Sequence, residues 1–132
     1  MSENAKLLAF VMKGLDEEAQ IAKGAGGDFW RCPSGLPGEV HDRTGGVSFS
    51  VPTIRYDHHI ARQDPARTLR RLERSRVLLD EYAKVADMDT DRPAHDFPSG
   101  RAVGLGFVVR QMAEEHADRL GYQAKWLPRF TR

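Results

Sequence analysis

Histidines and carboxylates are neighbours at four places along the chain, and such side chains can bind a metal ion or act as a general base. Two histidines four residues apart on a helix, or an H-E-x-x-H motif, would indicate a zinc or iron site, and the sequence has neither. We therefore expect the purified protein to hold no stoichiometric metal and no cofactor. The residues that stay open for a metal-assisted hydrolase are His41, Asp57, His58 and His95.

Two further histidines and the one cysteine have plainer interpretations. His59 precedes a predicted helix start and is expected to be a hydrogen-bonding structural residue, while His116 falls on the buried face of the last predicted helix. A nucleophilic thiol needs an electropositive, partly open setting. Arg31 supplies charge beside Cys32, but Pro33 indicates only a loop, so we assign no catalytic residue.

Six arginines lie between positions 62 and 76, and this density is the most unusual feature of the sequence. On a helix, Arg67, Arg70, Arg71 and Arg74 fall within about 100° of one another, and Leu78 lies inside the same stripe. Such a stripe is either a solvated helix face, a surface for an acidic protein partner, or a phosphate-binding face. Arg76 instead projects onto the apolar face, where it must form an ion pair or extend its stem to solvent.

The chain that positions these residues is predicted to be one mainly helical (α+β) domain covering 1–132. Its 132 residues suit one modest core, and a net charge of +1 gives no general attraction to nucleic acid or membranes. One cysteine excludes an internal disulfide framework and fits the cytoplasm, and no apolar run is long enough to span a bilayer. The oligomeric state cannot be predicted.

Three helices are predicted to pack as a core, with a small antiparallel hairpin or meander between the first two. The predicted segments are a helix over 3–23, a glycine-rich strand and loop segment over 24–63, a helix over 65–86, an acidic loop over 87–98, a helix over 100–120 and an aromatic tail over 121–132. Asp64-Pro65 and Ser99 are the expected helix caps. Gly104-x-Gly106 lacks the third glycine of a dinucleotide motif and is expected to allow close helix packing.

The expected buried stripes follow helical spacing. They comprise Leu8, Val11, Leu15, Ile21 and Ala22 in the first helix; Leu69, Leu72, Leu79, Ala83 and Ala86 in the second; and Ala102, Leu105, Val109, Met112, Ala113 and Leu120 in the third.

Two parts of the chain carry a family resemblance: the segment His59-Ile60-Ala61-Arg62-Gln63-Asp64-Pro65-Ala66-Arg67, and Tyr122, Trp126 and Pro128 near the end. Through these residues the chain resembles a family of small actinobacterial and actinophage proteins known as a domain of unknown function. The resemblance implies a bacterial or phage origin and no particular activity. The favoured hypothesis is a non-enzymatic accessory protein that binds an acidic protein partner through Arg67, Arg70, Arg71, Arg74 and Leu78. The alternatives are a nucleic-acid-binding regulator and the metal-assisted hydrolase.

Overall fold

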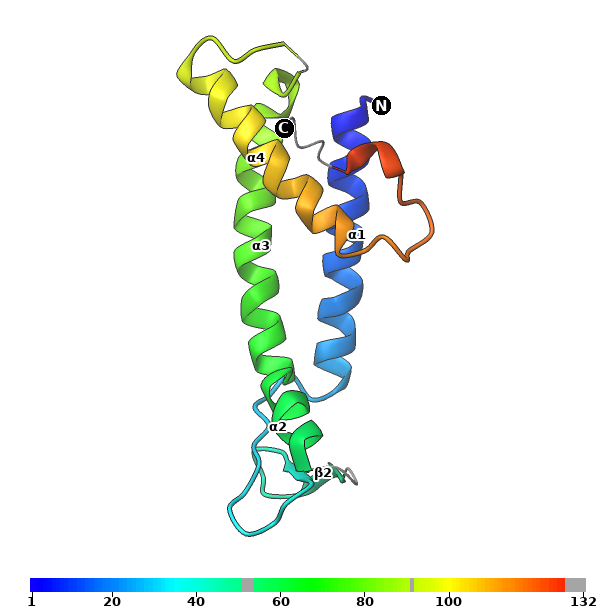
Figure 1. Ribbon diagram of the computed structural model, residues 1–132, viewed down its shortest axis with the longest axis vertical. Coiled ribbons are helices and arrows are strands. Elements are labelled where there is room, and N and C mark those ends of the chain that lie inside the picture. The colour runs from blue at the N-terminus through cyan, green and yellow to red at the C-terminus, as the bar shows by residue number, and fades with distance from the viewer. Residues whose placement is uncertain (51–53, 91, 128–132) are drawn as a thin grey trace. The chain divides into compact units, whose positions relative to one another are not determined.

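The protein is mainly helical with one small hairpin, as the sequence predicts. The computed structural model describes residues 1–50, 54–90 and 92–127 (Figure 1). In this part of the chain the elements are α1 (Glu3–Gly24), β1 (Glu39–His41), β2 (Val47–Ser50), α2 (Ile54–Arg62), α3 (Pro65–Val85), the 3₁₀ turn η1 (Ala86–Met88), α4 (Phe97–Glu114) and the 3₁₀ turn η2 (Ala124–Trp126). They form two compact units: a terminal unit, Met1–Asp16 with Arg74–Arg132, and a hairpin unit, Glu17–Glu73.

The terminal unit has a core made by the first half of α1, the second half of α3, and α4, which runs obliquely beside both (Figure 1). Each of these helices has one apolar stripe, so each needs the other two to cover it. Trp126 in the tail is also buried, and its ring lies 5.2 Å from that of Phe10, so the aromatic tail packs onto the core as expected. The buried core residues are Leu7, Val11, Leu15, Leu79, Tyr82, Ala102, Val109, Met112 and Ala113.

A polar network closes one end of this core around Asp89. Its carboxylate accepts hydrogen bonds from the Tyr82 hydroxyl (2.5 Å) and the Arg110 guanidinium (3.0 Å), and the Asn4 amide donates to the Asp89 carbonyl (2.8 Å). Gly106 makes room for this network, because a Cβ atom there would lie 2.7 Å from Asp89 Cγ. The expected close packing of another helix is therefore not seen at either glycine: Gly106 approaches Asp89, which follows η1, and Gly104 has no neighbour within 4 Å.

The hairpin unit contains the second half of α1, both strands, α2 and the first half of α3. The strands pair antiparallel, with Val40 opposite Phe49, and a bulge follows Val40, so that Val40 and His41 are both buried. The turn is held by Asp42, whose Oδ1 accepts hydrogen bonds from the Thr44 N–H at 2.9 Å and the Gly46 N–H at 3.1 Å. This is the predicted hairpin, with its turn at 44–46.

Asp64 starts α3 as predicted and also joins two segments of the hairpin unit. Its Oδ1 accepts the Arg67 N–H at 2.7 Å, which caps the helix, and its Oδ2 accepts the Trp30 N–H at 3.2 Å. One carboxylate therefore fixes the start of α3 and the position of the chain at Trp30.

The segment 24–63 contains a helix, α2, that the sequence analysis did not predict. It has nine residues and buries Asp57 and Ala61, so no run of apolar residues marks it. Helix prediction from spacing needs several apolar turns, and a short helix with a buried carboxylate does not supply them.

The last helix runs over Phe97–Glu114 rather than 100–120. Asp96, not Ser99, is its N-cap, and Ser99 completes a reciprocal capping box at the third helical position. After Glu114 the chain continues in turns, and Leu120 is fully exposed rather than buried. Gly121 does adopt the expected left-handed conformation (φ 98°), but it ends this series of turns.

The buried stripes of α1 and α3 match the expected ones in part. Val11, Leu15, Leu72 and Leu79 are buried as expected. In α1, however, Leu7 is buried while Leu8 is half-buried, and Ile21 is 73% exposed. In α3 Tyr82 is buried, and Ala83 is exposed.

Candidate functional site

The predicted arginine stripe is exposed along α3, and its residues belong to both units. Arg67, Arg70 and Arg71 lie in the hairpin unit, while Arg74 and Leu78 lie in the terminal unit. All five are exposed, Leu78 at 38%. The two groups are therefore described and tested separately.

The side chains of the three arginines in the hairpin unit make different contacts. The Arg70 guanidinium lies over the Phe29 ring, 5.5 Å from its centroid, and Arg71 pairs with Glu18 of α1 at 2.8 Å. An exposed ion pair of this kind contributes about 0–1 kcal/mol to stability. The Arg67 side chain has no ion-pair partner within the described ranges. These contacts orient two guanidinium groups and leave the third accessible.

An apolar groove of about 280 Å³ lies beside these arginines in the hairpin unit. Ile21 stands exposed at the groove, and the sequence analysis assigned this residue to the core. Trp30, from the glycine-rich segment, forms another part of the wall. The lining residues are Glu18, Ile21, Ala22, Ala25, Trp30, Gln63, Pro65, Thr68 and Arg71.

Arg76 behaves as its projection predicted. It extends from α3 to Asp16 of α1, and the two side chains form an ion pair at 2.6 Å inside the terminal unit. The guanidinium is partly exposed and therefore combines an aliphatic stem near the core with a charged end near solvent. Arg76 is accordingly a structural residue.

The four weak metal candidates do not come together. His95 is exposed in the terminal unit beside Asp96. His41 is buried in β1, and its Nε2 has no hydrogen-bond partner within the described part of the chain, the Glu39 carboxylate being 3.7 Å away. Asp57 and His58 are neighbours on α2, and the structure adds a residue that spacing could not find, Cys32.

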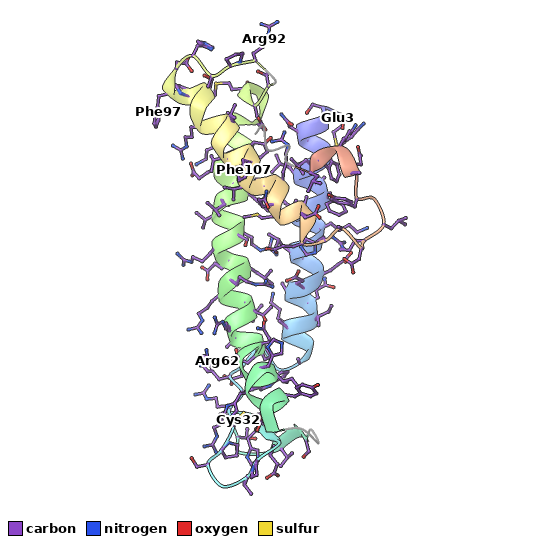
Figure 2. All side chains as sticks on the ribbon, viewed as in Figure 1. Glu3, Cys32, Arg62, Arg92, Phe97 and Phe107 are labelled. Carbon is purple, nitrogen blue, oxygen red and sulfur yellow. The ribbon has the colours of Figure 1, made fainter. Side chains whose placement is uncertain are left out.

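Cys32, Asp57 and His58 each offer a ligand atom, and these three atoms lie within 4.8 Å of one another. Figure 2 shows Cys32 beside α2, the helix that carries the other two. Asp57 is 2% exposed and accepts hydrogen bonds from the N–H groups of Gly38 (2.9 Å) and His58 (2.7 Å). The Gly38 N–H is the main cause that lowers the pKa of Asp57, whereas burial and the Asp57 charge raise the pKa of the Cys32 thiol.

The two histidines expected to be structural have different outcomes. His116 is buried in the terminal unit, as predicted. His59 is exposed, and its side chain makes no hydrogen bond within residues 1–50, 54–90 and 92–127. Its expected structural role is therefore not supported there, and α2 extends past it to Arg62.

No described helix combines the length and the apolar character that crossing a lipid bilayer requires. A search of the curated proteins and a search of the solved structures find no match to the chain. The model of a family of unknown function, DUF6221, matches residues 4–128, nearly the whole sequence, and the chain therefore belongs to that family.

Proposed function

We propose that this protein is a non-enzymatic accessory protein that binds an acidic surface of a partner protein through the hairpin unit. The binding surface, which we term the arginine face, consists of Arg67, Arg70 and Arg71 with the adjoining apolar groove. The resemblance stated above and the single cysteine favour the cytoplasm of an actinobacterium or of a phage-infected cell as its setting.

The observation that carries this proposal is the combination of exposed arginines with exposed apolar side chains. Ile21 is 73% exposed beside Arg71, and Phe29 is 53% exposed beneath Arg70. Arginine and aromatic residues are enriched in protein interfaces, where an apolar centre is surrounded by polar groups. The stacking of Arg70 on Phe29 holds the guanidinium before a partner arrives, so that less side-chain freedom is lost on binding.

A protein partner fits this surface better than nucleic acid does. Non-specific nucleic-acid binding depends on many phosphate contacts, and the chain has a net charge of only +1. An acidic partner can instead match each arginine individually and place an apolar side chain in the groove.

The test is capture of a partner from a lysate of the organism that carries the gene, with and without nuclease. We expect Arg67→Ser/Arg70→Ser/Arg71→Ser to lose a nuclease-resistant partner while its unfolding free energy stays within about 1 kcal/mol of the wild type. The control Lys13→Ser/Lys84→Ser/Arg92→Ser removes three exposed positive charges from the terminal unit and should keep the partner. Ile21→Ser, at the groove, should weaken capture without changing the charge.

Two outcomes would overturn the proposal. Equal capture by the arginine variant and the control would show that the arginine face is not the binding surface. A partner that nuclease removes, with a salt dependence that flattens by up to about three units in the arginine variant, would instead favour the nucleic-acid-binding regulator. Arg74→Ser/Leu78→Ser tests the terminal unit separately for a contribution to the same capture.

A further inference from the structure

We propose that Cys32, Asp57 and His58 form a binding site for a zinc ion, with a fourth position left for water or another ligand. Thiolate, carboxylate and imidazole groups all bind zinc, and three protein ligands with one open position are typical of sites that are not purely structural. The three ligand atoms lie within 4.8 Å of one another. This site is separate from the arginine face and does not depend on it.

The spacing is close to what zinc requires. Bond lengths of about 2.0–2.3 Å to a tetrahedral ion put neighbouring ligand atoms roughly 3.3–3.8 Å apart. Ligand atoms 4.8 Å apart would need to approach one another by about 1.0–1.5 Å. His58 is exposed, and Cys32 is half-buried in a segment outside the helices and strands, so rotation of these two side chains can supply the adjustment.

Asp57 is the ligand that the fold holds in place. No lysine or arginine of the described ranges forms an ion pair with Asp57, so backbone N–H groups stabilise its buried charge. The Gly38 and His58 N–H groups each donate to a different carboxylate oxygen, so each oxygen keeps a lone pair for a metal. Such hydrogen bonds orient a ligand in the way that outer-shell contacts do in metal sites.

The donor set selects the class of metal. A thiolate and an imidazole favour zinc and its spectroscopic substitute cobalt over magnesium and calcium, which prefer oxygen ligands alone. A cysteine binds zinc as the thiolate, so binding releases the thiol proton. Metal affinity should therefore rise with pH.

This proposal departs from the expectation drawn from the sequence. That expectation depended on histidine spacing within one helix, whereas these ligands come from an irregular segment next to Arg31 and from two adjacent positions of α2. Asp57 and His58 alone are weak evidence for a metal site. Cys32 joins them only because the fold of the hairpin unit brings it close to α2.

The test is titration of the full chain with Co²⁺ and with Zn²⁺. Cys32 is the only cysteine, so a thiolate-to-cobalt charge-transfer band can come from no other residue. We expect this band to saturate at one Co²⁺ per chain and to disappear when Zn²⁺ is added. Zn²⁺ should also slow the reaction of Cys32 with a disulfide reagent.

Three variants make the test specific. Cys32→Ser should abolish the charge-transfer band, and His58→Gln should weaken Zn²⁺ binding at least about tenfold, since even outer-shell changes cost 10–100-fold. His59→Gln removes the neighbouring exposed imidazole, which is not in the cluster, and should bind as the wild type does. Both His58 and Cys32 are at least partly exposed, so these variants should fold normally.

The proposal is overturned if the band is absent, or if His58→Gln and His59→Gln bind Zn²⁺ equally. It is also overturned by saturation at one metal per two chains together with dimerisation in sedimentation velocity, because the thiolates of two copies would then share the ion.

Discussion

Two glycines of α4 should respond in opposite ways to the same substitution. Replacing glycine by alanine inside a helix normally stabilises a protein by about 0.5–1 kcal/mol, because glycine loses more backbone freedom on folding. Gly104 has open space around its Cα, so Gly104→Ala should show this gain. At Gly106 the added Cβ would overlap the Asp89 carboxylate and would lie 2.7 Å from Arg110 Nη1.

The loss of stability expected for Gly106→Ala follows from the hydrogen bonds that Asp89 accepts. The overlapped oxygen accepts both the Tyr82 hydroxyl and the Arg110 guanidinium, so moving it weakens two hydrogen bonds to a charged group. Each such bond is worth about 1.5–3 kcal/mol, and their partial loss, less the helix gain of about 1 kcal/mol, leaves Gly106→Ala destabilised by about 1–3 kcal/mol. Burial, followed by the Asp89 bond, raises the pKa of Tyr82, so its hydroxyl remains a donor.

The assay is urea unfolding followed by circular dichroism, with Gly104→Ala as the matched control in the same helix. The two variants should differ by about 2–4 kcal/mol in unfolding free energy. A double-mutant cycle isolates the cause: in an Asp89→Ala background the Gly106→Ala penalty should largely disappear. Equal stability of the two glycine variants, or a penalty that persists without Asp89, would refute the reasoning.

Two further predictions concern the core and the start of α4. Leu72 is 2% exposed in the hairpin unit, so Leu72→Ala should cost about 2–5 kcal/mol in urea unfolding, and a loss below about 0.5 kcal/mol would contradict its place in the core. The Ser99 side chain and N–H lower the pKa of Asp96, so the stability that this carboxylate adds is present at neutral pH and is lost as the pH falls below about 4. The difference in thermal midpoint between wild type and Asp96→Ala should accordingly shrink from pH 7 to pH 3, and a constant difference would show that the charge of Asp96 does not contribute.

The features that the sequence predicts well are those that depend on neighbouring residues. Asp64-Pro65 marks the start of α3, because a capping carboxylate and a residue without an N–H act within one turn. The turn at Thr44-Gly45-Gly46 specifies the hairpin in the same way, and Gly45 adopts a positive φ of 85°. These signals need no information about the rest of the fold.

The errors arise where packing against distant segments decides the outcome. Ile21 and Leu120 satisfy a helical spacing, but nothing in the sequence states whether another segment covers them. Asp96 and Ser99 are three residues apart and both suit a helix cap, and only the fold shows that Asp96 is the cap and Ser99 its reciprocal partner. Tyr82 is buried because its hydroxyl reaches Asp89, seven residues away.

The candidate sites show the same difference between features that neighbouring residues determine and features that depend on the fold. The arginine stripe is visible in the sequence because four arginines share one helix face, whereas its apolar neighbours are not, since Ile21 and Phe29 come from other segments. The Cys32 cluster depends even more on the fold: Asp57 becomes a fixed, buried ligand only when α2 forms and the Gly38 N–H reaches it. A search for metal ligands by spacing along one helix therefore cannot find a site whose third ligand, Cys32, comes from a distant irregular segment.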